Sequence, residues 1–286
     1  MIYSLVKLYR KIDKYEWLFP NGINRILDIN GIKLCIDRLD LASNAYKTQH
    51  YEVISSLYRL IRDELNPFLC LDIGANYGFI SAIMAKTMPD AIIYALEPNE
   101  RLVPYIYENL KINHATDRKV IRNAMCGLNI SEEHDFFINP KGSQDSRVKG
   151  EKGWKKKVVS STTIDSILGE GTRPVFIKID TQGYEREIMN GGEKFFNHNN
   201  NWLVKMEFAP YLLEHNDTCP IGFLHNLVSN YDVSELPGTI PYCTKSLNDL
   251  FVNKISLGDY EYFIEYVRKL KANNRGWLDL LIRPKK

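Results

Sequence analysis

The sequence of 286 residues lacks any apolar run near the ~20 residues that a membrane-spanning helix needs. Its most apolar stretch, residues 68–84, is interrupted by Asp72, Asn76 and two glycines. No basic residue precedes the short apolar stretch at the amino terminus, which is unlike a secretory signal. We therefore expect a soluble, cytoplasmic protein without a transmembrane segment. An amphipathic helix expected over residues 3–18 leaves peripheral membrane contact open.

Cysteine is scarce, and neither sign of charge dominates. The five cysteines are scattered without a CxxC spacing, which argues against a zinc site or a disulfide framework and favours free thiols. Lys and Arg number 37 against 35 Asp and Glu, so the net charge is +2. Apolar residues make up 44% and charged residues 25%, an ordinary globular composition. We expect no nucleic-acid partner, because the chain is not strongly basic.

The order of the expected elements predicts an α/β fold. Residues 1–66 form a lead-in, with the helix over 3–18, a β-hairpin over 25–36 around an Asn-Gly turn, and a helix over 51–65 that ends before a proline. Strands and helices then alternate, which is typical of a parallel sheet covered on both faces. The expected strands span 68–73, 91–96, 119–125, 175–180, 202–207, 231–236 and 277–282, and the expected helices span 77–86, 101–113, 184–196 and 260–271.

The interval between two of these strands is too long for a crossover helix alone. Residues 126–174 contain two strand-like pieces, 135–139 and 157–163, on either side of a polar stretch. We expect an inserted β-hairpin beside the sheet, with a mobile loop over residues 140–154.

The strongest motif is Leu-Asp-Ile-Gly-Ala-Asn-Tyr-Gly at residues 71–78, between an expected strand and helix. Glycines let a ligand approach the backbone closely, and the helix start offers free amides. A dinucleotide fold would have G-x-G-x-x-G here, whereas Gly74 and Gly78 are four residues apart. Asp72 would also lie where phosphate charges belong. An acid at that point suits a cofactor with a cationic centre and an amino group, such as S-adenosylmethionine (SAM).

Glu97 ends the second expected strand, about 20 residues beyond this loop. A carboxylate there can accept hydrogen bonds from both hydroxyls of a ribose. Nicotinamide cofactors and SAM both carry a ribose, so Glu97 alone does not distinguish them. A solvated glutamate at the end of a strand is the alternative.

A third motif, Lys-Ile-Asp-Thr-Gln-Gly-Tyr-Glu, occupies residues 178–185 at the end of another strand. Lys178 and Asp180 alternate with isoleucines and so point to the same side. Asp180 would lie at the crevice, where a substrate hydroxyl could meet the cofactor; capping of the next helix is the alternative. Glu207 ends the following strand, and the two acids could share a proton, bind a divalent cation or hold sugar hydroxyls.

Basic residues crowd the expected insertion. They are Arg147, Lys149, Lys152, Lys155, Lys156 and Lys157. A solvated face is one interpretation. The other is a flexible clamp for a phosphorylated substrate, such as a nucleotide-linked or lipid-linked sugar.

Taken in order, these blocks resemble the FkbM family of SAM-dependent methyltransferases. The family pattern is D-x-G-A-N-x-G, then E-P-x, then K-x-D-x-[EQ]-G-x-E, then an acidic end to the next strand. The sequence has residues 72–78, Glu97-Pro98-Asn99, residues 178–185 and Glu207 at these places. Gln182 stands where many members carry Glu. The resemblance covers residues 51–207.

The resemblance implies a Rossmann-like class I methyltransferase domain over residues 67–286. This domain would have a seven-stranded, mostly parallel sheet with helices on both faces, and the insertion at about 126–174. It also implies O-methylation with SAM, often of sugars in glycan, polysaccharide or glycolipid assembly. On that template the methionine end, the ribose and the adenine of SAM would be held by Asp72, Gly74, Ala75, Asn76, Tyr77, Gly78, Glu97, Pro98, Asn123 and Ala124.

Our mechanistic hypothesis rests on the two acids and the lysine. Asp180 is the general base or anchors a cation, Glu207 is its partner, and Lys178 stabilises the developing alkoxide or tunes Asp180. Whether a divalent metal takes part stays open. Alternatives are an RNA or protein methyltransferase and a non-catalytic SAM-binding domain of a glycan-assembly system. A nicotinamide oxidoreductase is disfavoured by the missing glycine.

Overall fold

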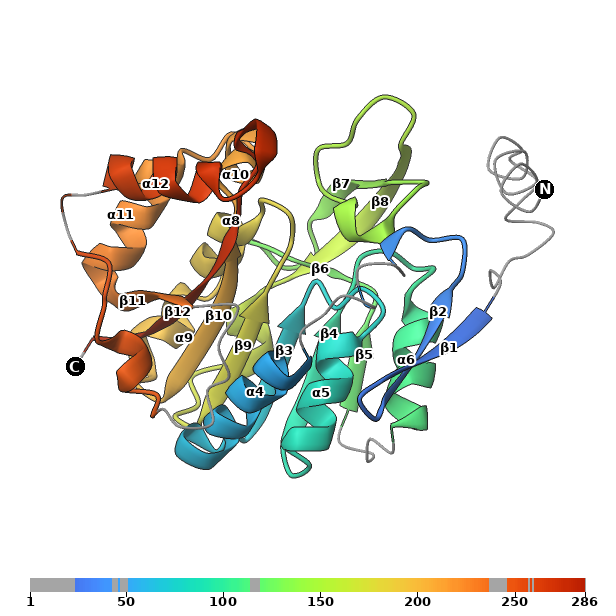
Figure 1. The fold of residues 1–286 in the computed structure, drawn as a ribbon, viewed down its shortest axis with the longest axis horizontal. Coiled ribbons are helices and arrows are strands. Elements are labelled where there is room, and N and C mark those ends of the chain that lie inside the picture. Colours follow the sequence, from blue (N-terminus) through green and yellow to red (C-terminus); the bar gives the residue numbers. More distant parts are fainter. Residues whose placement is uncertain are drawn as a thin grey trace.

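The computed structural model describes residues 24–42, 46, 51–113, 119–236, 246–256, 258 and 260–285. At its centre lies a seven-stranded sheet with the strand order β11-β12-β10-β9-β3-β4-β5 (Figure 1). The strands are β3 Leu69–Ile73, β4 Ile92–Leu96, β5 Lys119–Arg122, β9 Val175–Ile179, β10 Trp202–Phe208, β11 Tyr231–Leu236 and β12 Leu278–Pro284. Only β12 runs antiparallel to its neighbours among these strands. The predicted fold class is confirmed.

Helices cover both faces of this sheet because side chains alternate along each buried strand. One face, with Phe176 and Leu203, packs against α4 Tyr51–Leu65 and α5 Phe79–Thr87, and α6 Val103–Ile112 lies beside α5. The other face, with Ile177 and Val204, packs against several helices. These are α7 Ile164–Leu168, α8 Glu185–Asn190, α9 Glu193–His198, α11 Pro220–Asn230 and α12 Tyr260–Lys269.

The described part of the lead-in shares the hydrophobic core of the sheet. Strands β1 Asn24–Ile29 and β2 Ile32–Asp37 form the predicted hairpin, and α4 has the predicted bounds. The ring of Tyr58 on α4 contacts that of Phe176 edge to face, 5.5 Å between centroids. Asn109 on α6 holds β2 by accepting a hydrogen bond from the Cys35 N–H and donating one to its carbonyl. The helix predicted over residues 3–18 lies outside the described residues.

The insertion forms a second, three-stranded sheet above the carboxyl ends of the central strands (Figure 1). Its strands are β6 Met125–Cys126, β7 Glu133–Ile138 and β8 Lys155–Thr162. β7 and β8 pair antiparallel, so the inserted hairpin is confirmed. Its loop contains the short helix η1 Ser143–Asp145 and returns to β7 through a bridge between Phe137 and Arg147. The mobility of this loop stays a prediction.

Three details differ from the expected elements. The strand expected over residues 119–125 ends at Arg122, and β6 belongs to the second sheet. The helix expected over 184–196 is divided into α8 and α9 at Gly191, whose carbonyl accepts a hydrogen bond from the Asp165 N–H at 3.0 Å. The sequence analysis also missed α7, α11 and α10 Pro210–His215.

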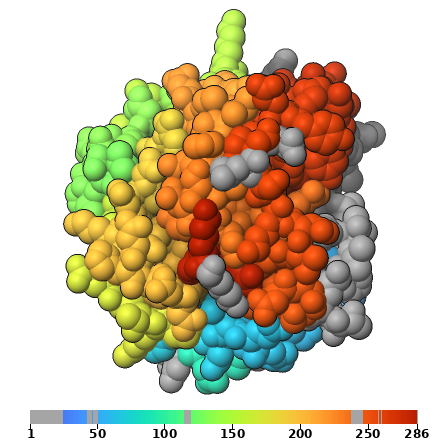
Figure 2. Space-filling view, turned by 90° about the vertical axis from the view of Figure 1, so that its left-hand side faces the viewer, coloured from blue at the N-terminus to red at the C-terminus, as the bar shows by residue number. Residues whose placement is uncertain are grey.

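Elements from the carboxyl-terminal part of the chain form one end of the molecule. Figure 2 shows this end, where orange and red segments, the colours of α11, α12 and β12, lie at the centre and right of the view. Among the described residues, no helix combines the length and the apolar composition needed to cross a bilayer.

Candidate active site

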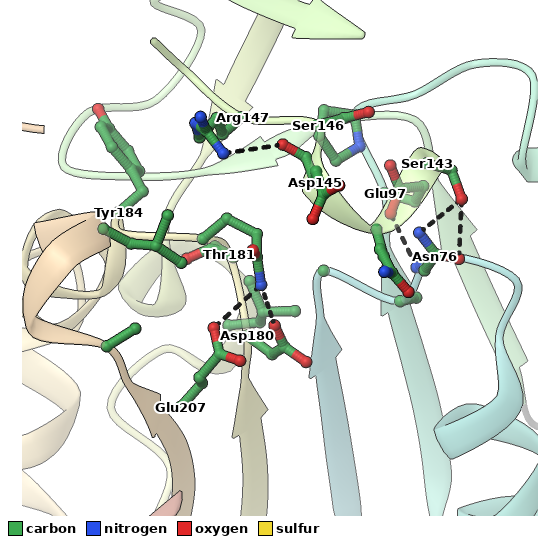
Figure 3. A pocket seen from close by; sticks show the side chains of 18 of the residues that line it. Asn76, Glu97, Ser143, Asp145, Ser146, Arg147, Asp180, Thr181, Tyr184 and Glu207 are labelled. Carbon is green, nitrogen blue, oxygen red and sulfur yellow. Dashed lines mark hydrogen bonds between the residues drawn. The ribbon is translucent and has the colours of Figure 1, made fainter. Parts of the chain in front are cut away.

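A cavity of about 1180 Å³ opens at the carboxyl ends of the central strands, beneath the insertion (Figure 3). This is the edge at which open α/β sheets bind ligands. Side chains from three parts of the chain face it: Asp180 and Glu207 after β9 and on β10, Asn76 and Glu97 after β3 and β4, and Ser143, Asp145 and Arg147 from the insertion. We call the first two groups the floor and the insertion side the roof.

The loop after β3 packs closely against the carboxyl ends of β4 and β9. The N–H groups of Gly74 and Ala75 both donate to the carbonyl of Leu96 at 3.0 Å. Gly74 has a φ of +78°, and a Cβ there would lie 2.0 Å from the carbonyl oxygen of Asp180. Only glycine fits this turn. Gly74, Ala75 and Asn76 therefore form a wall of backbone that a ligand can approach closely.

Glu97 is buried at the end of β4, with 5% of its surface exposed. Its carboxylate accepts hydrogen bonds from the N–H groups of Asn76 and Asn99, both at 2.8 Å. Burial raises the pKa of Glu97 to about 7, although the two backbone hydrogen bonds oppose the rise. A solvated glutamate is therefore not what the structure shows. Each oxygen keeps a lone pair, so the group can accept two further hydrogen bonds from adjacent hydroxyls.

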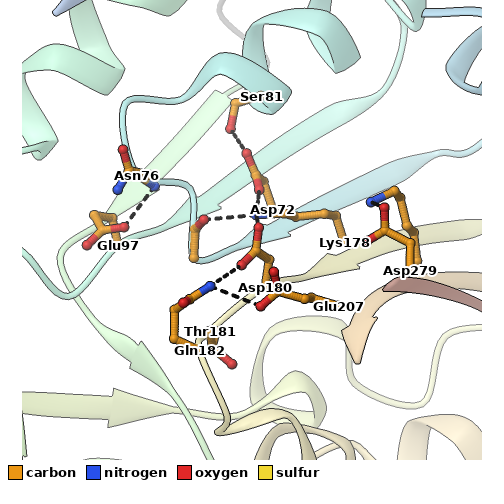
Figure 4. Close-up of polar contacts among 12 residues, drawn as sticks. Asp72, Asn76, Ser81, Glu97, Lys178, Asp180, Thr181, Gln182, Glu207 and Asp279 are labelled. Atoms are coloured by element: carbon orange, nitrogen blue, oxygen red, sulfur yellow. Dashed lines mark hydrogen bonds and ion pairs between the residues drawn. The ribbon is translucent and has the colours of Figure 1, made fainter. Parts of the chain in front are cut away.

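Lys178 lies in the floor between two carboxylates (Figure 4). Its Nζ is 3.3 Å from Oδ1 of Asp72 and 3.5 Å from Oδ2 of Asp180, and it donates to the carbonyl of Gly74 at 2.9 Å. Burial opposes the charge on Lys178, but Asp180 and Asp72 outweigh burial and raise its pKa. Lys178 is therefore a fixed cation that joins β3, β9 and the glycine loop.

Asp180 and Glu207 are joined by the side-chain amide of Gln182 (Figure 4). The Nε2 of Gln182 donates to Oδ1 of Asp180 at 3.1 Å and to Oε2 of Glu207 at 2.9 Å. Burial and then the charge of Asp180 raise the pKa of Glu207 well above its usual value. The side chain of Asp180 is 41% exposed toward the cavity. The pair thus has one carboxylate open to the cavity and one that retains a proton more readily.

Glu185 fixes the loop that carries Asp180. Its Oε1 accepts hydrogen bonds from the Thr181 N–H at 3.0 Å, from the Thr181 hydroxyl at 3.0 Å and from the Gly183 N–H at 3.1 Å. The N-cap of α8 is Tyr184, which makes no side-chain capping bond. Asp180 therefore does not cap the helix, and its carboxylate stays available to the cavity.

Comparison with known protein families gives a match that includes these site residues. A model of the FkbM methyltransferase domain matches residues 72–236. The chain belongs to this family. The match covers the floor and the roof, and it ends before α12 and β12. Comparison with curated proteins finds no significant match.

Solved structures resemble the FkbM chain only in outline. TYW2 of M. jannaschii, crystallised with AdoMet, has 11% identity and a TM-score of 0.43, with 92% of this chain and 85% of that chain covered. An O-methyltransferase from Bacillus cereus in complex with SAH has 10% identity and a TM-score of 0.43, with 81% and 80% covered. At these values neither structure identifies the acceptor of this chain.

Several residues predicted to bind the cofactor lie behind the cavity of the FkbM domain. Asp72 is fully buried and accepts a hydrogen bond from the Ser81 hydroxyl at 2.5 Å. Tyr77 is 1% exposed and donates its hydroxyl hydrogen to Asp40 at 2.8 Å, and Gly78 packs against Ile106. None of the three lines the cavity. These three residues support the loop from behind, and the part of the loop that lines the cavity is Gly74, Ala75 and Asn76.

The two residues expected on the adenine side, Asn123 and Ala124, lie differently. Ala124 lines the cavity, as does Pro98. The side-chain amide of Asn123 instead donates to the carbonyls of Glu97 and Pro98 at 3.0 and 3.1 Å. Asn123 therefore shapes the loop after β4.

Sequence reasoning missed the contacts between roof and floor. The side-chain amide of Asn76 donates to the Ser143 hydroxyl at 3.1 Å, and the Tyr46 hydroxyl donates to Oδ1 of Asn76 at 2.8 Å. Ser143 is further held by Asp40, which accepts from its N–H at 3.0 Å. No local pattern marks Ser143, which is 67 residues from Asn76.

Metal binding was left open for Asp180 and Glu207. Among the described residues, no group of three or more His, Cys, Asp and Glu side chains is arranged to hold an ion. Both hydrogens of the Gln182 amide point at the two carboxylates, so the amide nitrogen occupies the position between them. The pair can still offer two oxygen ligands.

Proposed function

We propose that this FkbM-family chain is a SAM-dependent O-methyltransferase that methylates a sugar hydroxyl in the cytoplasmic assembly of a glycan, polysaccharide or glycolipid. The observation that carries the proposal is the carboxylate of Asp180, open to a large cavity and held beside Glu207 and Lys178. Enzymes place such a base where a hydroxyl must lose its proton.

The floor suits SAM in shape and in charge. Glu97 can accept hydrogen bonds from two ribose hydroxyls, and Gly74, Ala75 and Asn76 present backbone without bulky side chains. Carboxylates of the floor favour a cofactor that carries a sulfonium and an ammonium group. When bound, SAM supplies an electrophilic methyl group. Pro98 and Ala124 would border its adenine.

The floor also supplies what the acceptor needs. The attacking hydroxyl oxygen forms a bond to the methyl carbon while the bond from that carbon to sulfur breaks, and the hydroxyl proton passes to Asp180. Lys178, at 3.5 Å from Asp180, stabilises the negative charge that develops beside it. Glu207 and Gln182 keep the base oriented. The remaining contribution of the protein is alignment and exclusion of water.

A sugar acceptor fits the lining of the outer cavity. Trp154, Tyr211 and Trp277 line it, and aromatic faces pack well against the apolar faces of sugar rings. Trp277 is 48% exposed although it precedes the buried strand β12.

The deciding experiment has two readouts. Calorimetry measures whether the protein binds SAM and S-adenosylhomocysteine. Incubation with SAM and a panel of nucleotide sugars, glycolipids and oligosaccharides is then followed by mass spectrometry for a gain of one methyl group. We expect cofactor binding and methylation of one acceptor class, with dialysis against a chelator showing whether a metal is needed. Methylation of RNA or protein instead, or binding without any transfer, would contradict the proposal.

A further inference from the structure

Charged side chains line the cavity at both of its ends. The floor holds the carboxylates of Glu97, Asp180 and Glu207. The roof holds two more, those of Asp145 and Glu151, and Glu151 is paired with Arg147. The two lysines of the floor are already paired: Lys178 with Asp72 and Asp180, and Lys205 with Asp279 at 2.6 Å. A second set of cations, Lys152, Lys271 and Arg275, lines the outer end. Within the described part of the chain, no carboxylate lies within ion-pair distance of these three.

The basic run predicted in the insertion is mostly neutralised. Arg147 pairs with Glu151 at 2.6 Å, Lys149 with Asp217, Lys156 with Asp135 at 2.6 Å and Lys157 with Glu100 at 2.6 Å. Of the six basic residues, Arg147 and Lys152 line the cavity, and Arg147 is buried by its own partners. Among these six residues, Lys152 is thus the exposed one that lines the cavity; Lys141, earlier in the insertion, is also exposed and lines it.

The other two cations come from the turn between α12 and β12. Figure 1 shows this turn, in red beside α10, across from the β7–β8 loop. Asn273 and Asn274 have positive φ angles of 59° and 55°. A Cβ on Gly276 would lie 1.9 Å from the carbonyl oxygen of Val267, so the turn is seated tightly on the end of α12. Such a built turn holds Lys271 and Arg275 at defined places.

Neighbouring groups orient these side chains toward the cavity. The guanidinium of Arg275 lies over the ring of Tyr211, 4.5 Å from its centroid. This contact leaves the edge of the guanidinium free to bind an oxyanion with two parallel hydrogen bonds. Lys271 acts electrostatically on Asp145 of the roof, which places its charge near the insertion. The roof and the turn therefore present cations to one space.

We propose that this outer end binds the phosphate or diphosphate group of the acceptor, through Lys152, Lys271 and Arg275. The inference rests on the proposed function and specifies its substrate class: a sugar linked to a phosphate ester. A cationic cofactor is repelled from these three residues and attracted to the floor, whereas an anionic acceptor is attracted to them. Three cations match one di- or trianionic group and are too few for a nucleic-acid backbone.

The aromatic residues of the outer end complete the site. Trp154 lies next to Lys152 on one side, and its ring is packed by Arg147, 4.7 Å away. Trp277 follows Arg275 on the other side and directly precedes Leu278, which pairs with Phe208 beside Glu207. A sugar ring between these faces would have its phosphate at the cations and a hydroxyl toward Asp180.

The test measures anion binding directly. Inorganic pyrophosphate, UDP and farnesyl diphosphate are titrated by calorimetry into the full chain, with and without saturating S-adenosylhomocysteine. We expect each to bind, and the triple variant Lys152→Ala, Lys271→Ala, Arg275→Ala to lose about tenfold or more in affinity. The control is Lys156→Ala, the same change on the same insertion at a paired residue outside the cavity. It should bind all three ligands as the parent does.

The outcomes separate this inference from the proposed function. A preference for UDP assigns a nucleotide-linked acceptor, and a preference for farnesyl diphosphate assigns a lipid-linked one. If the anions bind the triple variant and the parent equally, or bind neither, the inference is overturned even where S-adenosylhomocysteine binds normally. Binding of glucuronate in place of the phosphate compounds would likewise overturn it. Failure of S-adenosylhomocysteine to bind would instead contradict the proposed function, and the anion titrations without it would still be decisive here.

Discussion

The floor and the outer end of the cavity differ in how their charged side chains are paired and exposed. On the floor, charged groups contact one another, as in the contacts of Lys178 with Asp72, Asp180 and the Gly74 carbonyl. Apart from Asp180, whose side chain is 41% exposed, these groups are buried or half-buried. At the outer end, Lys152, Lys271 and Arg275 are exposed, and no carboxylate of the described residues lies within ion-pair distance of them. Buried, fully partnered charges hold their geometry, and exposed cations can adapt to a ligand.

This difference predicts a division of labour that kinetics can detect. On the proposed function, groups on the floor act on the reacting atoms, so their loss should lower turnover or cofactor affinity. On the proposed anion site, groups at the outer end bind the acceptor far from the reaction, so their loss should raise KM with little effect on turnover. Substitutions in the two regions can therefore be compared within one cavity.

The largest effect is expected for Asp180→Asn. The amide has nearly the shape of the carboxylate but cannot take the hydroxyl proton, so turnover should fall by at least ~100-fold. The Kd for SAM should change little, because the proposal assigns cofactor binding to Asn76 and Glu97, which this change leaves in place. Steady-state rates with the methylated acceptor and calorimetry with SAM measure the two quantities.

The matched control for this variant is Asp145→Asn, the same change on the roof of the same cavity. Its turnover should stay within about threefold of the parent, as for most substitutions away from the reacting groups. Equal losses in both variants would show that the floor has no special role. Near-normal turnover of Asp180→Asn would remove that residue from the mechanism.

The next effect concerns Glu97 and pH. Since burial raises the pKa of this group to about 7, its charged form is lost as the pH falls through that value. The ionised carboxylate accepts hydrogen bonds more strongly than the protonated group, whose O–H must itself find an acceptor. S-adenosylhomocysteine, which has no sulfonium charge, should therefore bind more weakly at pH 6 than at pH 8.

Glu97→Gln should remove this pH dependence. It should also weaken binding at pH 8 by roughly 10- to 100-fold, the value of a lost charge-assisted hydrogen bond. The exposed Glu133 of β7 provides the control Glu133→Gln, which should keep both the affinity and its pH dependence. A pH dependence that persists in Glu97→Gln would assign the titration to another group.

Much of the floor could be predicted from the sequence because its motifs are local. The glycine loop, Glu97 and the block at residues 178–185 each lie within a few residues of a strand end, where alternation alone places Lys178 and Asp180 on one side. Helix α4 was predicted to its bounds, since helical spacing and Pro67 define both ends. The hairpin at residues 24–37 follows from its Asn-Gly turn.

The rest depends on contacts between distant parts of the chain. Asp72 lies opposite Lys178 in the register of β3 and β9, a pairing of strands about 100 residues apart that no local pattern encodes. The sequence therefore predicts Asp72 as a cofactor-binding residue without showing that its side chain lies outside the lining of the cavity. Lys271 and Arg275 were not recognised either, because only the fold places their turn across from Lys152. One interpretation of the basic run in the insertion is a phosphate clamp, but most of its residues form ion pairs with carboxylates instead.

The smallest change in turnover is expected for Gln182→Glu, which can be compared with a matching change on the roof. A glutamate at this position, as in many FkbM members, would replace the two donated hydrogens with a third negative charge beside Asp180 and Glu207. Like charges favour protonation. The base should then become available only at higher pH, so the rising limb of the pH–rate profile should move up by about one unit. Turnover measured at a pH on that limb should fall by at most about tenfold.

The same substitution on the roof, Gln144→Glu, places a negative charge in the same cavity and should leave the limb in place, because Gln144 has no described contact with either carboxylate. Added Mg²⁺ shows whether Asp180 and Glu207 work without a metal, bridged by the amide of Gln182, or bind a divalent cation. Since three carboxylates can hold a cation that two hold poorly, added Mg²⁺ should restore the activity of Gln182→Glu and leave the parent unchanged. If the parent also needs Mg²⁺, the amide of Gln182 does not take the place of a metal, and Asp180 and Glu207 bind the ion themselves.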